Sequence, residues 1–148
     1  HDIKWPDGSS NYVSINVAAA PQPSATPRPQ APARIVVSTG LTISPGSPRV
    51  NQWVNGRYCV RNIGDYEFSA RFIGIKGRHV ASGQSFDFFW MENVRIGPRS
   101  EWCYDTNRQL TRTGQYWFTP NYSPDGSSWD DIKWENGATN YVYITVSP

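Results

Sequence analysis

The feature that most constrains this chain of 148 residues is a repeat that links its two ends. HDIKWPDGSSNYVSINV, residues 1–17, aligns with DDIKWENGATNYVYITV, residues 130–146, at a constant offset, and ten of the seventeen positions are identical. Each copy contains a Trp, a turn pair (Asp7-Gly8 or Asn136-Gly137) and an alternating run that ends in Val. Since Asp-Gly and Asn-Gly accept the positive φ of a type I′ turn, each copy predicts a β-hairpin.

Two copies of one hairpin on either side of a single body indicate a tandem array. We expect residues 1–17 to be the terminal hairpin of a preceding or neighbouring repeat. An isolated hairpin is barely stable in water, so it needs a partner sheet, supplied by a covalent neighbour or by another chain through strand donation. The alternative is a disordered remnant of a truncated repeat. The residues expected to hold the hairpin in place are Ile3, Trp5, Tyr12, Val13, Ile15 and Val17.

A Pro- and Ala-rich segment, AAAPQPSATPRPQAPA at residues 18–33, follows the first copy. It contains no aromatic or large apolar residue, so burial cannot offset the entropy of ordering it. We interpret it as a semi-rigid linker that spans at most roughly 50 Å at about 3.1 Å per residue. Residues 34–148 remain for one domain, which is enough for a β-sandwich.

The body predicts all-β structure, because short alternating runs are separated by turn residues and no helical period is sustained. Seven to nine strands at this spacing favour an immunoglobulin-like Greek-key β-sandwich, with a closed barrel as the alternative. The expected strands lie at residues 35–38, 41–44, 56–62, 67–76, 86–95, 100–110, 114–122, 128–134 and 141–146. The expected breaks include Gly77.

Three motifs carry a family resemblance: GRYCVRNIG at 56–64, IGPRSEWCY at 96–104 and GQYWFTPNY at 114–122. They resemble the bacterial extracellular immunoglobulin-like domains related to CARDB modules, which use Asn-x-Gly at the end of the second strand and Gly-x-Tyr in the sixth. The resemblance covers nearly all of residues 34–148. It implies a spacer, adhesion or accessory module on a surface protein, without a catalytic set.

Cys59 and Cys103 are the only cysteines, and each lies on an expected strand with large apolar residues on either side. If those apolar residues face the core, both thiols point outward from neighbouring strands of one sheet. We therefore predict a disulfide between them, with two free thiols as the alternative. A disulfide implies an oxidising compartment, so we expect the protein to be secreted and to lie outside the cell or on its surface.

Aromatic residues make up 14% of the chain, more than the inner faces of a small sandwich comfortably bury. Strand alternation then forces some outward, where they can stack on sugar rings or be covered by a neighbouring subunit. The candidates for glycan or partner contact are Trp90, Trp117, Trp129 and Tyr122. The alternative is that these rings belong to the core and its margins. Candidate glycosylation sites are Asn121, in an Asn-x-Ser pattern, and Ser24 and Thr26 in the linker.

Other classes of function have little support in the sequence. A net charge of +2 on scattered basic residues argues against nucleic-acid binding, and no apolar run is long enough for membrane insertion. No triad or paired metal-ligand spacing surrounds His79, so we expect no enzyme activity, metal or cofactor. Asp125, Asp130 and Asp131 crowd one region, which suggests calcium, but they lack EF-hand spacing and turn chemistry explains Asp125 equally well.

These observations favour a non-enzymatic structural or interaction repeat in a stalk, surface layer or filament. Its expected partners are neighbouring repeats or identical subunits. The alternative is a carbohydrate-binding module that holds a polysaccharide on its outward aromatic residues.

Overall fold

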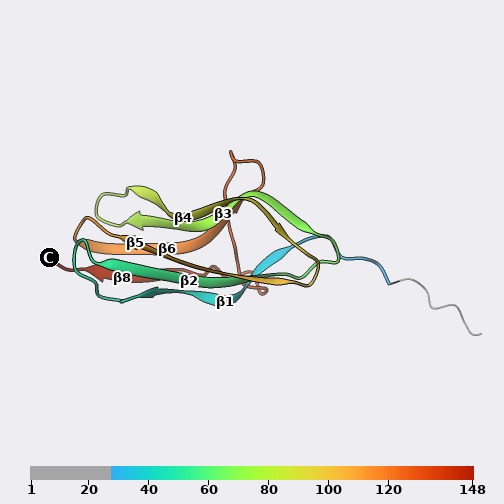
Figure 1. The fold of residues 1–148 in the computed structure, drawn as a ribbon, viewed down its shortest axis with the longest axis horizontal. Helices are drawn as coiled ribbons and strands as arrows, with labels where there is room; N and C mark the ends of the chain where they lie inside the picture. The colour runs from blue at the N-terminus through green and yellow to red at the C-terminus, as the bar shows by residue number, and fades with distance from the viewer. Residues whose placement is uncertain (1–27) are drawn as a thin grey trace, which may run out of the picture.

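The computed structural model describes residues 28–148, and these form two antiparallel sheets packed face to face (Figure 1). The smaller sheet has the order β1-β2-β5, and the larger sheet has the order β4-β3-β6, with β7 and β8 both paired to the free edge of β6. The eight strands are β1 (Ile35–Ser44), β2 (Trp53–Asn62), β3 (Phe68–His79), β4 (Ser85–Ile96), β5 (Glu101–Gln109), β6 (Gly114–Ser123), β7 (Asp130–Asp131) and β8 (Val142–Val146). The prediction of an all-β sandwich with seven to nine strands is confirmed. Residues 1–17 and most of the predicted linker lie outside the described residues.

The core lies between the sheets and follows from alternation along the strands. Val54, Tyr58 and Val60 of β2 face Ile73 and Ile75 of β3, and all five are fully buried. The Tyr58 hydroxyl crosses the core and donates a hydrogen bond of 3.0 Å to the Gly74 carbonyl, so its polar end is satisfied where water is excluded. Burial raises the pKa of Tyr58 well above its ordinary value, which keeps it a hydrogen-bond donor.

The Asn-x-Gly motif ends β2 for a physical reason. The Asn62 side chain is fully buried and donates to the carbonyls of Tyr66 (2.7 Å) and Ile96 (3.0 Å). Its oxygen accepts the Gly64 amide at 3.0 Å. A side chain at Gly64 would collide with the backbone of Pro32, so the motif places the incoming chain against the turn after β2.

The Gly-x-Tyr motif at the start of β6 forms a tyrosine corner. The Tyr116 ring is buried, and its hydroxyl donates to the carbonyl of Arg112, four residues upstream, at 3.0 Å. This contact ties the connection after β5 to the core and recurs in immunoglobulin-like sandwiches. Gly114 has φ of +117°, a conformation that glycine adopts without strain.

The C-terminal segment corrects one prediction, because residues 130–146 do not form a β-hairpin. Both β7 and β8 run antiparallel to β6, along the same edge, so the two do not pair with each other. Between them the chain crosses to β1, where the Lys133 carbonyl accepts the Val37 amide at 2.9 Å. The Asn136-Gly137 turn is present, with φ of +85° at Gly137, but it only reverses the chain locally between Trp134 and Ala138. We call residues 130–146 the closing segment.

Two expected breaks are absent from the strands. The single strand β1 covers both 35–38 and 41–44, with register shifts on either side of Thr39. Gly77 lies inside β3, where the ring of Phe86 occupies the space that a side chain would take. Glycine at this position therefore marks close packing rather than a turn.

The last residues of the predicted linker are held against the domain. The Ala31 amide donates to the Asp65 carboxylate at 2.8 Å, and the Asp65 amide donates to the Ala31 carbonyl at 2.9 Å. Arg99 forms an ion pair with the same carboxylate at 2.6 Å. The Ala31 amide and Arg99 lower the pKa of Asp65. The carboxylate therefore stays charged and keeps both contacts at the point where the chain enters the domain.

Candidate functional site

The outer face of the larger sheet carries two groups of aromatic side chains. In the first, Phe72 of β3 contacts Trp90 of β4 edge to face, with ring centroids 5.4 Å apart. The other side of Phe72 stacks on Trp129, at 5.8 Å and an interplanar angle of 11°. Trp90 and Trp129 remain 49% and 42% exposed, so the group is assembled without being covered.

The second group lies over β6 and the closing segment. Trp117 meets Tyr141 edge to face at 5.3 Å, and the Lys76 ammonium lies 5.9 Å from the centre of the Trp117 ring. The Tyr141 hydroxyl donates to Asp131 at 3.0 Å. Tyr143, which is directly opposite Trp117 in the register, is 59% exposed.

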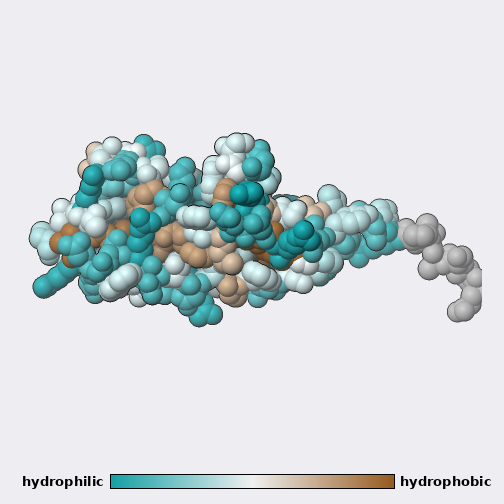
Figure 2. All heavy atoms as spheres, turned by 45° about the horizontal axis from the view of Figure 1, so that its top comes forward, coloured by the Kyte–Doolittle hydropathy of each residue, from teal (hydrophilic) through white to brown (hydrophobic). Residues whose placement is uncertain are grey.

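A hollow of about 230 Å³ lies on this face, lined by Lys76, Ser85, Phe86, Asp87, Asn121 and Trp129. Figure 2 shows the surface dipping between two protrusions, the turn between β3 and β4 and the loop between β6 and β7. Lys76 and Asp87 are register partners, yet they form no ion pair with each other or with any other described residue. Both charges therefore remain available at the edge of the hollow.

Asn121 is the buried polar residue of the hollow. Only 3% of it is exposed, and its side chain forms no hydrogen bond with any residue in 28–148. Its register partner is Gly74, which has no side chain to cover it. Its amide atoms are not among the buried side-chain atoms that lack a hydrogen bond, so they keep contact with solvent and can bond to water or to a ligand in the hollow.

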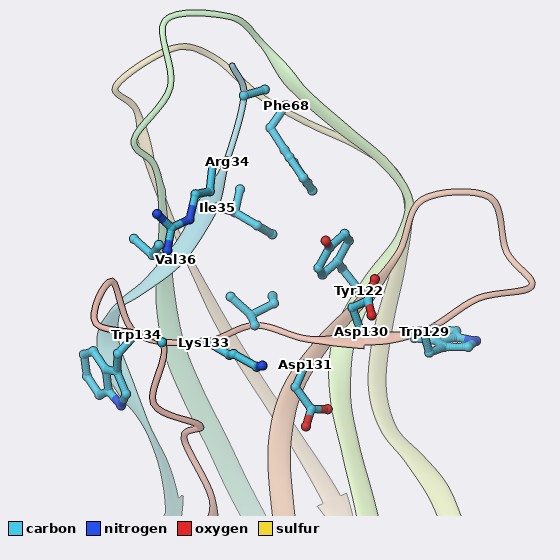
Figure 3. Close-up of a pocket in the computed structure, with 13 residues that line it drawn as sticks. Arg34, Ile35, Val36, Phe68, Tyr122, Trp129, Asp130, Asp131, Lys133 and Trp134 are labelled. Atoms are coloured by element: carbon cyan, nitrogen blue, oxygen red, sulfur yellow. The ribbon is translucent and has the colours of Figure 1, made fainter. Parts of the chain in front are cut away.

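A larger cavity of about 600 Å³ opens at one end of the sandwich, between β1 and the closing segment (Figure 3). Arg34, Lys133, Asp130 and Asp131 line it together with apolar and aromatic side chains. Burial, and to a smaller extent the charge of Asp130, raises the pKa of Tyr122. The described lining holds no histidine, cysteine, serine or threonine.

The predicted disulfide is confirmed. Cys59 of β2 and Cys103 of β5 are directly opposite in the register and are bonded to each other. Their neighbours Tyr58 and Tyr104 face the core and stack at 5.2 Å, so the disulfide lies on the outer face of the smaller sheet. It joins two strands of one sheet, whereas the disulfide of antibody domains connects the two sheets.

Among residues 28–148, one histidine–serine contact occurs, at the turn between β3 and β4. His79 Nδ1 lies 2.8 Å from Ser82 Oγ, and His79 Nε2 lies 3.0 Å from the Thr113 carbonyl oxygen. An exposed pair that bridges two loops, with a carbonyl in place of an acid, fits a structural contact. Within residues 28–148, no group of three or more His, Cys, Asp or Glu side chains is arranged to hold a metal. The Asp125 carboxylate instead accepts the amides of Ser127 and Ser128 at 2.8 and 2.9 Å, as turn chemistry predicts.

The remaining predicted residues are placed as follows. Trp90, Trp117 and Trp129 share the outer face, but Tyr122 lies apart, half-buried on the inner side, where its ring meets Phe68 at 5.5 Å. Asn121, the candidate glycosylation site of the folded domain, lies in β6 and is 3% exposed. Ser24, Thr26 and the residues expected to hold the first hairpin lie outside the described residues.

Sequence reasoning missed three residues of the outer face: Phe72, Lys76 and Asp87. Their positions depend on the register between β3 and β4, which alternation within one strand cannot supply. Alternation does separate the residues of β6 correctly, since Tyr116 and Phe118 are buried and Trp117 faces outward.

Comparison with solved structures places the fold. The chain is similar to the CARDB domain of a Pyrococcus furiosus protein, solved in complex with di-metal ions, at 16% identity and a TM-score of 0.51, over 78% of this chain and 94% of that one. It is similar to an alkylpurine DNA glycosylase from Pseudomonas fluorescens bound to DNA containing an abasic-site analogue, at 9% identity and a TM-score of 0.58. It is also similar to a β-glucosidase from Listeria innocua in complex with glucose, at 10% identity and a TM-score of 0.56.

The coverage of the two enzymes is partial. The matches include 80% and 78% of this chain but only 32% of the glycosylase and 16% of the β-glucosidase. No family model and no curated protein matches the sequence. At these identities the comparisons show the fold alone, a CARDB-like immunoglobulin sandwich. No helix in the described part of the chain could span a membrane.

Proposed function

We propose that this chain is a non-enzymatic interaction module from a tandem array of sandwiches in an extracellular or cell-surface protein. One observation carries the proposal: residues 1–17 are identical to the closing segment at every position where that segment packs against its sandwich. The seven positions at which the copies differ are all exposed in the closing segment, and they are residues 130, 135, 136, 138, 139, 143 and 145. Each of its buried or half-buried positions is identical, and they are residues 131, 132, 134, 140, 142, 144 and 146.

The identical residues make the contacts that attach the closing segment to its sandwich. Ile132, Ile144 and Val146 are buried in the core. The Asn140 side-chain oxygen accepts the Leu41 amide at 2.6 Å, which joins the segment to β1. A copy that keeps these residues and changes only the surface has the requirements for closing a second sandwich of the same design.

The path of the chain supports an array joined end to end. The N-terminal part of the described chain leaves one end of the sandwich, and the C-terminus lies at the opposite end (Figure 1). The contacts of Asp65 with Ala31 and Arg99 hold the entering chain against the domain. Domains connected in this way follow one another along a line, with the Pro-rich linker setting their spacing.

The compartment and the absence of catalysis belong to the same proposal. Disulfides persist in oxidising surroundings, so the bond between Cys59 and Cys103 supports a secreted protein. The exposed contact between His79 and Ser82 has no acid partner, which supports a module that binds rather than reacts.

A shortened chain tests the array. We expect residues 28–129, which lack both copies, to remain unfolded, because β6 loses the strands on its outer edge, β1 loses its hydrogen bond to Lys133, and the core loses three buried side chains. Residues 1–129 should fold, since residues 1–17 can take the vacant place. Residues 18–30, ahead of the contact between Ala31 and Asp65, reach roughly 40 Å at about 3.1 Å per residue, against about 34 Å for the ten residues of β6. Far-UV circular dichroism and urea unfolding measure folding, and light scattering separates closure within one chain from exchange between two.

Matched variants sharpen this test. In the chain 1–129, Ile3→Ala should abolish folding, because Ile3 corresponds to the buried Ile132. Ser14→Ala should leave folding unchanged, because Ser14 corresponds to the exposed Tyr143. If residues 1–129 are as unfolded as residues 28–129, the first copy cannot close a sandwich and the array proposal fails.

A further inference from the structure

We propose that the hollow on the outer face of the larger sheet is a binding site for a neutral polysaccharide and holds one pyranose ring at a time. The inference goes beyond the array, because it concerns a surface that the closing segment does not need in order to pack. It rests on three features of the hollow: an aromatic wall, an unpartnered amide and a balanced pair of charges.

The aromatic wall is Trp129. One face of its indole stacks on Phe72, which fixes the orientation of the ring, and the side chain remains 42% exposed beside the hollow. The loop that carries Trp129 is also fixed, since the Asp125 carboxylate accepts two backbone amides and the Ser123 hydroxyl accepts the Gly126 amide at 2.8 Å. A rigid, exposed ring presents apolar area to a sugar at little cost in conformational entropy.

The unpartnered amide is Asn121. It lies in the floor of the hollow, 3% exposed and without a side-chain hydrogen bond to any described residue. An amide offers one acceptor and two donor hydrogens, which suits a pair of neighbouring hydroxyl groups. A ligand that displaces water from this group has to replace its hydrogen bonds, so a site of this kind discriminates in favour of polyhydroxylated rings.

The charges decide between neutral and acidic ligands. Lys76 and Asp87 stand opposite each other on β3 and β4, so one ammonium and one carboxylate border the hollow. Their charges cancel, and each can form charge-assisted hydrogen bonds with hydroxyl groups. The volume of about 230 Å³ is below the roughly 300–1,000 Å³ of pockets that enclose drug-sized ligands, which favours one ring of a longer chain.

Affinity electrophoresis of the full chain tests the site. The probes are hydroxyethylcellulose, laminarin, galactomannan and soluble xylan as neutral polysaccharides, and polygalacturonate as the acidic one. We expect at least one neutral polysaccharide to retard the protein, and Trp129→Ala to weaken that retardation roughly tenfold or more. Asn121→Ala should weaken it as well, with circular dichroism confirming that each variant is folded. The matched control is Trp53→Ala, because Trp53 is 60% exposed on the smaller sheet, away from the hollow.

Several outcomes would overturn the proposal. They are no retardation by any neutral polysaccharide, retardation by polygalacturonate alone, or equal weakening by Trp129→Ala and Trp53→Ala. Self-association of the chain that Trp129→Ala abolishes would assign the face to a second copy instead. Each of these results leaves the test of the array unaffected, because the shortened chains report on folding rather than on sugar binding.

Discussion

The two outer faces of this sandwich obey the same alternation but carry different side chains. On the smaller sheet the outward positions hold Arg57, charged pairs, the disulfide and the isolated ring of Trp53, and Asn55 donates to Asp105 across β2 and β5 at 2.6 Å. On the larger sheet the outward positions hold Phe72, Trp117 and the rings that pack on them.

The difference between the two faces separates side chains that stabilise the fold from side chains that can contact a partner. The smaller sheet presents polar groups and the Trp53 ring to water, and its disulfide restricts the unfolded chain. Exposed rings on the larger sheet add little to the core, since Trp90 and Trp129 keep nearly half of their surface in contact with solvent. Ordered aromatic side chains without a cover are typical of a surface that meets a partner.

Of the two outer faces, the smaller sheet should show the larger effect on stability. Replacing Cys59 and Cys103 together with Ala should lower the free energy of unfolding by about 2–4 kcal/mol, because the bond closes a loop with a sequence separation of 44. Urea unfolding at neutral pH measures this loss. Polysaccharide binding should be unchanged in the variant, and weakened binding at full folding would show that the two faces are coupled.

Removing Trp129 from the exposed group that it forms with Phe72 and Trp90 should have a smaller effect on the free energy of unfolding. Trp129→Ala should lower the free energy of unfolding by about 1 kcal/mol, the typical contribution of one aromatic pair, since the side chain is largely exposed. Phe118→Ala in the core is the comparison, with an expected loss of about 3–5 kcal/mol. If the two losses are similar in urea unfolding, the outer aromatic group is structural and the contrast between the faces disappears.

As the pH falls, the loop between β6 and β7 should loosen before the outer face of the smaller sheet is affected. The amides of Ser128 and Ser127 hold the pKa of Asp125 well below its ordinary value of 3.8. A carboxyl with a lowered pKa in the folded state stabilises that state above pH 3.8, and this contribution is lost as the pH falls further. We expect the fluorescence of Trp129 to change as the pH falls below about 4, at pH values where circular dichroism shows that the domain is still folded.

Asp125→Asn provides the control for that titration. The amide oxygen of Asn still accepts the two hydrogen bonds but carries no charge, so the change at low pH should be absent. An identical acid response in this variant would assign the change to another carboxyl group.

The sequence predicts whatever depends on alternation within one strand. Period two places Cys59 and Cys103 outward and Phe118 inward, and the structure agrees. Composition and turn residues indicate the sandwich, because β-propensity and strand spacing are also local properties.

Contacts between distant strands could not be predicted in this way. The crossing of the closing segment depends on the hydrogen bond between Lys133 and Val37, whereas the local pattern around Asn136-Gly137 predicts a hairpin. The hollow likewise exists only because β3, β4 and β6 bring Lys76, Asp87 and Asn121 together. The register that aligns them is a property of the whole sheet.

The smallest expected effect concerns the charged pair of the smaller sheet. Arg61 and Glu101 approach to 3.5 Å, but both side chains are at least 40% exposed, so water and salt screen their attraction. A double-mutant cycle with Arg61→Ala and Glu101→Ala should give a coupling energy of about 0.5 kcal/mol or less, and lower still at high salt. A coupling above about 1 kcal/mol would mean that surface charges on this face hold the fold together, and the stabilising role assigned to the disulfide would then be shared.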